Sequence, residues 1–304
     1  MDLKQLQYFL AVVEAGGFSA GATALQLAQS SLSRQIALLE TELGQRLLVR
    51  TGRGATPTEA GLALLPHARQ MLDIARRARD ELQEMDDSPS GRITVGMPPR
   101  VALGLSAPLI QAFRQRLPRA VVSVSEALSI QLHEQLVAGR LDMALLFDPP
   151  SSPLLHYQTL MQEPLILVAP ARGARLPERL SLGGLARYPL VLPSPPNAIR
   201  SLVDVALKAR HVEVTVLAEV GAVKTVLTLV AQGVGCTIVP ASSLALLDDP
   251  ASVRHCPIGP PAILSRLVLA TPKAGPHTRL RRETVQLLQA LDFRSPAPLG
   301  AGAP

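Results

Sequence analysis

The residues best suited to chemistry lie on one side of a short helical pattern that follows Gln29. Apolar residues recur there at i, i+4, i+7 and i+11, which is the single stripe of an amphipathic helix. At about 100° per residue, the opposite side carries small polar residues and one arginine. The stripe is Leu32, Ile36, Leu39 and Leu43, and the opposite side is Ser30, Arg34, Ala37 and Thr41. A slim face with a planar fork of donors suits the base edges of a DNA major groove.

Two further arginines, Arg50 and Arg53, follow in the stretch LLVRTGRGAT. Apolar and polar residues alternate there, and glycines stand at positions 52 and 54. This pattern predicts a β-hairpin with both arginines at or near its tip. An arginine on a narrow ribbon beside a helix suits a phosphate or a minor groove.

Three short helices must position these side chains. The first is expected over residues 2–15, with Asp2 at its N-terminus and one apolar face directed inward. The second is expected over about residues 20–27, and the third from near Ser30, where Ser30 or Ser31 caps the first turn, to a C-cap at Gly44. The expected inner face of the first helix is Leu3, Leu6, Phe9 or Leu10, and Val13, and Phe18 is expected in the core.

The run AQSSLSRQIALLETELGQRLLVRTGRGATPTEAG resembles the N-terminal signature of the LysR-type transcriptional regulators, which are winged helix-turn-helix proteins. The resemblance covers residues 1 to about 90 and is strongest to the nitrogen- and sulfur-assimilation regulators. The family usually has proline where this chain has Ser30, and serine also caps a helix and contacts phosphate. The DNA-binding residues are then expected to be Gln29, Ser30, Ser31, Ser33, Arg34, Arg50 and Arg53.

A long helical pattern begins at Pro57-Thr58-Glu59 and continues to about Met85. A heptad seam runs through it at Leu64, Ala68, Met71, Ala75, Ala78, Leu82 and Met85. The seam is typical of a helix that pairs with a second copy, and the resemblance implies the same. The alternative is an amphipathic helix packed on its own domain. The run from Asp86 to Gly91 ends the pattern with acidic residues, proline and glycine.

From Arg92 onward, short apolar strand patterns alternate with helical ones, which indicates α/β domains with largely parallel sheets. The resemblance implies two lobes joined by two crossover strands, as in periplasmic solute-binding proteins. The expected domains are a winged helix-turn-helix at 1–58, a linker helix and hinge at 59–88, and an effector domain at 89–304. Lobe I is expected at 91–163 with 266–296 and lobe II at 164–265, and the tail from Ser295 is expected to be disordered.

Ligands of such sheets bind beyond the carboxyl ends of the strands, where helix N-termini offer free N–H groups and partial positive charge. A small carboxylate or another anion is therefore the expected effector. The expected effector-binding residues are Met97, Arg100, Ser129, Phe147, Ser194, Asn197 and Ala222. Many relatives have hydroxyl residues where this chain has Met97, Pro98 and Pro99. Two prolines supply no N–H, so Arg100 either replaces those donors or is a surface residue.

The net charge is +6, but residues 1–90 hold 9 Lys+Arg and 11 Asp+Glu, a net of −2. The case for DNA binding therefore rests on the positions of three arginines and not on bulk charge. The basic second part, with a net of +8 over residues 91–304, favours either an anionic ligand or a solvated surface. No apolar run is long enough to cross a membrane, and MDLKQLQYFL does not read as a secretory signal.

Other chemistry finds little support in the sequence. Gly233-Val234-Gly235 lacks a third glycine and precedes a strand, so it reads as a turn. Cys236 and His255 could be a nucleophile and a base, but no third orienting group can be named. The spacing of the two cysteines does not suggest a metal site, and two lone cysteines fit a reducing cytoplasm. An enzyme on the same two-lobed fold would need a paired acid and base, and a solute receptor would need export.

These patterns predict a cytoplasmic LysR-type regulator without cofactor, metal or catalytic residues. Its expected partners are double-stranded DNA with an interrupted palindromic operator, a small effector, and a second copy in a homodimer or homotetramer. RNA polymerase is a further partner compatible with this reading, and a membrane is not. The alternative reading is a two-lobed binding protein or enzyme without a regulatory role.

Overall fold

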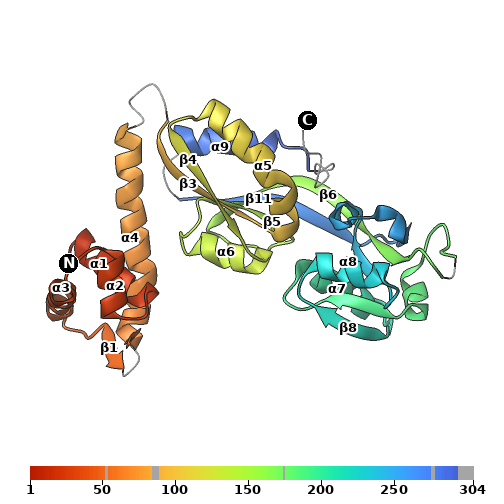
Figure 1. The fold of residues 1–304 in the computed structure, drawn as a ribbon, viewed down its shortest axis with the longest axis horizontal. Helices are drawn as coiled ribbons and strands as arrows, with labels where there is room; N and C mark the ends of the chain where they lie inside the picture. Colours follow the sequence, from red (N-terminus) through yellow and green to blue (C-terminus); the bar gives the residue numbers. More distant parts are fainter. Residues whose placement is uncertain (52–53, 84–88, 174, 275–277, 294–304) are drawn as a thin grey trace. The chain divides into compact units, whose positions relative to one another are not determined.

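The computed structural model of the 304-residue chain describes residues 1–51, 54–83, 89–173, 175–274 and 278–293 (Figure 1). Its contacts separate two compact units, residues 1–87 with 138–140 and residues 88–137 with 141–304. The first unit is a helical head with a wing and a long helix, and the second is an α/β unit with two lobes.

The head is built from α1 (Leu3–Glu14), α2 (Phe18–Ala24) and α3 (Gln29–Leu43). Asp2 caps α1: its side chain accepts from the Gln5 N–H while the Gln5 side chain accepts from the Asp2 N–H. The inner face of α1 is Leu6, Phe9, Leu10 and Val12. Val12 is fully buried, the predicted Val13 is partly buried against the same core, and the predicted Leu3 is 40% exposed.

The helix α3 starts one residue before its predicted start, and its N-cap is Ala28. The predicted capping by Ser30 or Ser31 was therefore wrong, since both serines lie inside the first turn and no side chain caps this end. The other end matches the prediction, because Gly44 has the left-handed φ of 64° that favours glycine. Leu32, Ile36 and Leu39 are buried, while Leu43 is 38% exposed.

The wing is an antiparallel hairpin of β1 (Leu48–Thr51) and β2 (Gly54–Pro57), as predicted. Thr51 lies opposite Gly54, while Gly52 and Arg53 lie outside the described residues. Ala55 N–H donates to the carbonyl of Gly16 in the turn after α1, at 3.0 Å. A Cβ on Gly54 would lie 2.0 Å from that carbonyl oxygen, so only glycine allows this close approach.

The long helix α4 (Glu59–Gln83) begins where Thr58 Oγ1 accepts a hydrogen bond from the Gly61 N–H. The predicted seam has a local partner along its first part. Leu64, Ala68 and Met71 pack into the core of the head, and Ala68 is fully buried. The alternative of a helix packed on its own domain is therefore confirmed for this part of the seam. Ala78 is exposed, and Leu82 and Met85 lie outside the described side chains.

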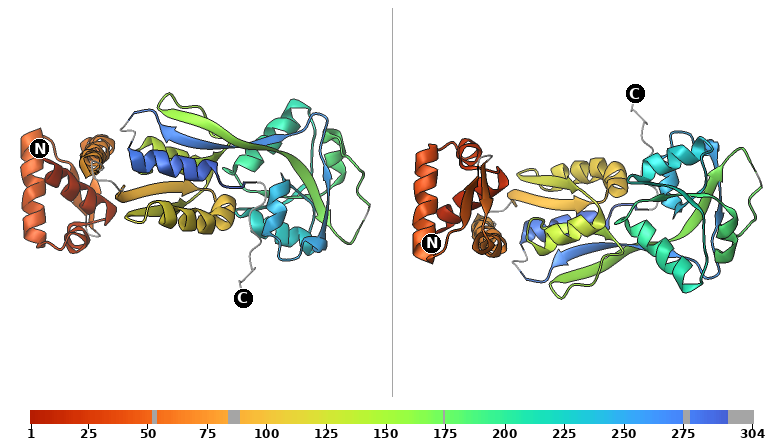
Figure 2. Two further views of the ribbon diagram at one scale, coloured as in Figure 1. Left: turned by 90° about the horizontal axis from the view of Figure 1, so that it is seen from above. Right: turned by 90° about the horizontal axis from the view of Figure 1, so that it is seen from below.

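Lobe I of the second unit has a sheet in the order β4-β3-β5-β11-β6. Its strands are β4 (Ala120–Glu126), β3 (Gly91–Met97), β5 (Met143–Phe147), β11 (Leu264–Pro272) and the first part of β6 (Leu155–Pro170). The helices α5 (Pro99–Arg116) and α9 (Arg279–Gln289) cover one face and α6 (Ser129–Val137) covers the other (Figures 1 and 2).

Lobe II is organised around the second part of β6, which pairs antiparallel with β9 (Thr237–Pro240) and β10 (Val253–Pro257). β7 (Leu190–Pro193) pairs in parallel with β8 (Val216–Val220), and a bridge from Leu190 to Cys236 joins this pair to β9. Two α-helices and three short 3-10 helices complete the lobe: α7 (Ala198–Ala209), α8 (Val223–Ala231), η1 (Leu182–Arg187), η2 (Ala241–Leu246) and η3 (Pro250–Ser252).

The two strands β6 and β11 are the crossovers that the family resemblance implied. The expectation of parallel sheets is confirmed for β3 with β4 and β5 and for β7 with β8, and it is wrong for β6 and β11, which run antiparallel to every strand they pair with. The strand β10 was also missed. The predicted bounds of the two lobes are not settled by these pairings and remain our proposal.

Candidate functional site

The outer side of α3 is the first candidate surface. Ser30, Arg34, Ala37 and Thr41 are all exposed, as the helical period predicted. No carboxylate of the described residues lies within ion-pair distance of Arg34. Ser31 is also exposed, and Gln29 accepts a hydrogen bond from Ser19 Oγ on α2 at 3.1 Å. Because no side chain caps α3, its first-turn N–H groups remain available to an anion.

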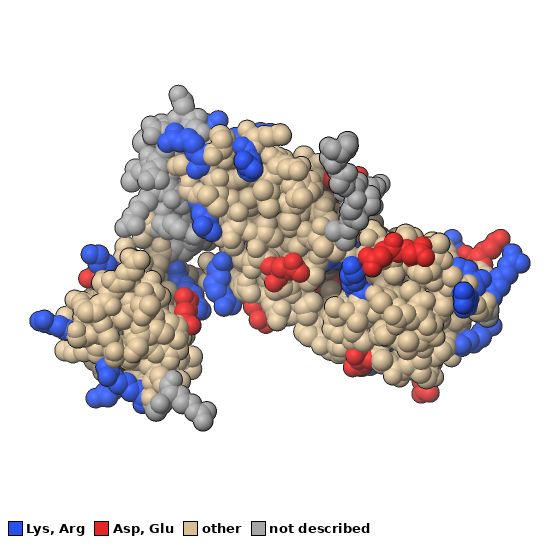
Figure 3. All heavy atoms as spheres, viewed as in Figure 1, with Lys and Arg blue, Asp and Glu red and all other residues tan. Residues whose placement is uncertain are grey.

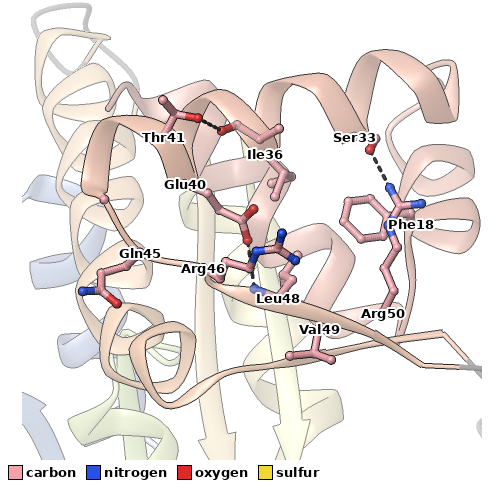
Figure 4. A pocket seen from close by; sticks show the side chains of 12 residues that line it. Phe18, Ser33, Ile36, Glu40, Thr41, Gln45, Arg46, Leu48, Val49 and Arg50 are labelled. Carbon is pink, nitrogen blue, oxygen red and sulfur yellow. Dashed lines mark hydrogen bonds between the residues drawn. The ribbon is translucent and has the colours of Figure 1, made fainter.

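An open groove of about 700 Å³ separates α3 from the wing (Figure 4). Arg50 crosses it: Nη2 donates to Ser33 Oγ on α3 at 2.6 Å, and the guanidinium carbon lies 4.6 Å from the ring centre of Phe18. Phe18 is therefore only partly buried and also supports Arg50, beyond its predicted place in the core. Arg50 lies in β1 and fixes the wing to α3, so its side chain is held before any ligand arrives.

Glu40 is a second connection across this groove that the sequence interpretation missed. Its Oε1 accepts hydrogen bonds from the main-chain N–H groups of Leu47 at 2.8 Å and Leu48 at 3.1 Å. These two donors precede and begin β1, so the carboxylate fixes where the wing leaves α3 (Figure 4). In the sequence, Glu40 is only an acidic residue near the inner edge of a helix. Such residues are too common to predict a contact with the wing.

The second candidate site is a cleft of about 250 Å³ between the lobes. Of the predicted effector-binding residues, five line it: Arg100, Ser129, Phe147, Asn197 and Ala222. Two do not. Met97 is fully buried in the core of lobe I, because it faces inward at the end of β3. Ser194 continues the pairing of β7 with β8, since its N–H donates to the Val220 carbonyl.

Four helix N-termini meet at this cleft, but they differ as donors. Asn197 caps α7, with Oδ1 accepting from the Ile199 N–H at 2.9 Å, so its side chain has the ordinary capping role. Ser129 Oγ accepts from the Phe147 N–H at 2.9 Å. Pro98 and Pro99 begin α5 without N–H groups, whereas Ala222 leaves the start of α8 without a side-chain cap.

Arg100 is the centre of a buried polar network in the second unit. Its Nη1 lies 3.0 Å from Glu163 Oε1 and also donates to Ser242 Oγ, and the guanidinium lies 4.2 Å from the ring centre of Phe147. The side chains of Arg100 and Glu163 are 12% and 11% exposed. Burial lowers the pKa of Arg100, and the nearby Glu163 carboxylate opposes that change.

Glu163 joins elements of both lobes in this network. It lies on the crossover strand β6 and accepts from Ser242 twice, through the N–H at 3.1 Å and the hydroxyl at 2.7 Å. Ser242 belongs to lobe II, whereas Arg100 lies in α5 of lobe I. Arg100 Nη2 is buried and has no hydrogen-bond partner among the described residues, which leaves its N–H groups for an added anion. Local spacing in the sequence gave no sign that Glu163 is a partner of Arg100, because 63 residues separate the two.

Asp148 closes the end of β5 with a left-handed φ of 44°. Its carboxylate accepts from Ser265 Oγ at 3.0 Å and from the Arg266 N–H at 3.1 Å. Desolvation by burial raises the pKa of Asp148, and these hydrogen bonds partly offset the rise. Its contacts attach β5 to β11 and do not form part of the cleft lining.

The other reactive side chains that the structure describes are two thiols and a histidine–tyrosine pair. Burial raises the pKa of both thiols, Cys236 and Cys256, which keeps them protonated. His133 Nε2 lies 3.0 Å from Tyr157 Oη, which donates to the Pro150 carbonyl. Over the described residues, no three His, Cys, Asp or Glu side chains are grouped as metal ligands, and none of the described helices has the length and apolar character needed to cross a membrane.

Two family models match the chain. Residues 3–62 match the bacterial regulatory helix-turn-helix protein model of the lysR family, and residues 86–292 match the LysR substrate binding domain. The nitrogen assimilation regulatory protein nac of Klebsiella aerogenes is 32% identical over 297 residues, which is 97% of this chain and 96% of that protein. Its namesake in Escherichia coli K12 is 34% identical, over 80% of this chain and 79% of that protein.

Solved structures show the same arrangement of elements. The full-length CbnR regulator complexed with its target DNA matches with a TM-score of 0.68 and 26% identity, over 95% of this chain and 99% of that chain. A full-length OxyR variant from Pseudomonas aeruginosa matches with a TM-score of 0.77 over 100% of this chain and 99% of that chain. At 21% identity, the second match speaks for the fold alone.

Proposed function

The chain belongs to the LysR family of transcriptional regulators, with a DNA-binding helix-turn-helix and an effector-binding domain, and we propose which of its residues do each task. Arg34 contacts base edges in the major groove, with Gln29, Ser30, Ser31 and Ser33 along the groove rim. The observation that carries this proposal is the exposed outer side of α3, where Arg34 has no competing carboxylate among the described residues.

Arg50 and Arg53 hold the DNA backbone or the minor groove in this proposal. Support comes from the position of Arg50, which is exposed and braced by Ser33 and Phe18 beside α3. A braced arginine loses less conformational freedom on binding than a free one. Arg53 lies outside the described residues, and its role rests on the sequence alone.

A gel-shift titration at fixed salt tests the assignment of Arg34. Arg34→Ala is expected to weaken operator binding by about 1–3 kcal/mol, roughly 5-fold to 150-fold, and to relax the base preference at one position. Thr41→Ala is the matched control, because Thr41 shares the exposed side of α3 but lies near its C-terminal end. Equal operator affinity of the two variants would refute the assignment.

The proposed effector is a small anion with an apolar body, bound in the cleft between the lobes. Its apolar part meets Leu103, Leu128 and Phe147, and its anionic group meets the free Nη2 donor of Arg100 and the uncapped start of α8. The charged cleft residues Lys224 and Glu126 then select among anions. A ligand of this kind changes DNA binding only through a different affinity for two arrangements of the protein.

A thermal-shift screen with small aliphatic and aromatic carboxylates tests the effector proposal. At least one carboxylate is expected to stabilise the wild type, and Arg100→Met is expected to abolish that shift. Arg119→Met is the control, because Arg119 is exposed on lobe I and outside the cleft lining. A carboxylate that stabilises all three proteins equally would place its site elsewhere.

We also propose that the protein acts in the cytoplasm as a homodimer or homotetramer, by binding and not by catalysis. The pairing surface on α4 is the side that the head leaves open, where Leu62 is 58% exposed and Ile74 is 63% exposed. Two copies would then read the half-sites of an interrupted palindrome, and RNA polymerase is a further proposed partner. Ile74→Glu should shift the mass measured by light scattering toward a smaller assembly.

A further inference from the structure

A second hollow, separate from the effector cleft, lies at one end of lobe II. It has a volume of about 1150 Å³ and runs between the extended segment 175–181 and the strand β10. Small-ligand pockets usually have volumes of about 300–1000 Å³, so this groove exceeds what a small effector needs. Its lining residues are Arg175, Leu176, Pro177, Glu178, Arg179, Leu180, Ser181, Arg187, Tyr188, Val253, Arg254 and His255.

The groove is strongly basic. It contains four arginines and one carboxylate, Glu178, and none of these arginines has an ion-pair partner in the described part of the chain. Arg175, Arg179 and Arg187 are exposed. Arg254 donates from Nη2 to the Gly173 carbonyl at 3.0 Å, and its Nε is buried with no hydrogen-bond partner among the described residues. Figure 3 shows basic side chains gathered at the end of lobe II that carries the loop after β6.

The inner wall of the groove is an open strand edge. β10 is the terminal strand of its sheet. The main-chain N–H and C=O groups of its successive residues point alternately toward β6 and away from it. Ser252 accepts from Ala171 on the β6 side, while Pro257 accepts from Leu180 on the outer side. The main-chain groups of Val253 and His255 therefore face the groove. Within the described residues, no main-chain hydrogen bond satisfies them there.

We propose that this groove binds an extended acidic segment of a partner protein, which adds as a strand to the free edge of β10. The main-chain groups of His255 and Val253 hydrogen-bond to the added strand. The arginines meet its carboxylates, and the half-buried Leu176 and Tyr188 meet the side chains between them. Duplex DNA fits less well, because it satisfies the arginines but leaves the strand edge unpaired.

The test selects peptides from a random-peptide phage library on the immobilised full-length protein. The expected result is enrichment of sequences in which acidic and apolar residues alternate. A labelled synthetic peptide of the enriched sequence then gives dissociation constants by fluorescence anisotropy. Its affinity should fall with added salt, because the arginine contacts are exposed.

Matched variants separate the main-chain hydrogen bonds of β10 from the contacts of the arginines. His255→Pro removes one outward N–H and is expected to weaken the peptide about tenfold or more, whereas His255→Ala keeps the N–H and changes affinity less than about twofold. The fold tolerates proline on this side of β10, since Pro257 already occupies an outward position. Arg175→Glu with Arg187→Glu should also weaken binding about tenfold, and Arg114→Glu with Arg119→Glu on lobe I should not.

Three outcomes would overturn the proposal. One is a selection that yields no acidic sequences. Another is an acidic peptide that binds His255→Pro and the Arg175/Arg187 double variant as tightly as the wild type. The third is operator-free duplex DNA whose affinity depends on Arg175 and Arg187 while no peptide is enriched, which would make the groove a nucleic-acid surface. Since the groove and the effector cleft share no lining residue, failure here leaves the proposed effector site untouched.

Discussion

Neutralising Glu163 should weaken the fold and strengthen anion binding at the same time. In Glu163→Gln, the buried guanidinium of Arg100 loses its only charged partner among the described residues, which lies 3.0 Å away. Coulomb's law with an effective dielectric constant of about 20 gives an attraction of roughly 5 kcal/mol at this distance. Breaking a buried ion pair typically destabilises a protein by about 3–5 kcal/mol. Glutamine keeps one acceptor oxygen, so we expect about 3 kcal/mol.

Thermal unfolding measures the first effect. For a domain of about 200 residues, each kcal/mol lowers Tm by about 2–4 °C, so Glu163→Gln should lower Tm by about 6–12 °C. Glu213→Gln removes an exposed carboxylate of lobe II with no ion pair in the described residues, and it should leave Tm nearly unchanged. Replacing Arg100 and Glu163 together by methionine should recover much of the loss, because no unpaired buried charge remains.

Anion affinity measures the second effect. Without Glu163, the positive charge of Arg100 is no longer neutralised beside the cleft. A carboxylate found in the thermal-shift screen should therefore bind the variant about tenfold more tightly, which corresponds to about 1.4 kcal/mol. The reasoning is refuted if Glu163→Gln and Glu213→Gln have the same Tm. It is also refuted if the carboxylate binds the destabilised variant no more tightly than the wild type.

Three further perturbations have expected outcomes. Arg50→Ala removes the contacts with Ser33 and Phe18, and hydrogen exchange in β1 and β2 should become faster by an amount equal to about 1–2 kcal/mol. Gly54→Ala places a Cβ against the Gly16 carbonyl and should abolish operator binding in gel shifts, whereas an alanine at the unobstructed Gly44 should be tolerated at about 1 kcal/mol. Burial raises the pKa of Asp148 in the folded state, so this group stabilises the fold below its unfolded pKa, and that stabilisation is lost as pH rises through the folded pKa. The Tm of Asp148→Asn should therefore rise relative to that of the wild type when thermal unfolding is measured from acid to neutral pH.

The sequence was most informative where one element determines its own surface. The period of α3 predicted that Arg34 would be exposed and that Leu32, Ile36 and Leu39 would be buried, because the angle per residue alone settles this. Gly44 likewise marked the end of α3 through its backbone conformation. The predicted strands and helices of the effector unit mostly have the type that the pattern indicated.

Features that depend on distant residues could not be predicted in this way. The heptad spacing of α4 showed that one stripe of the helix is apolar. It did not show that Leu64 and Met71 pack against the helical head of the same chain. The polar first part of β6 hid a long strand, because its side chains face solvent on one side. The partner of Arg100 is 63 residues away on that same strand, and no local pattern connects the two.

The continuity of β6 through both lobes affects how one lobe can rotate against the other. It is one unbroken strand of 16 residues whose first part pairs with β11 and whose second part pairs with β9 and β10. The change of neighbours falls at Pro164, directly after Glu163, where proline supplies no N–H. A rotation of one lobe against the other would therefore twist β6 at this junction. An anion that draws Arg100 away from Glu163 would loosen the side-chain restraint next to the pivot.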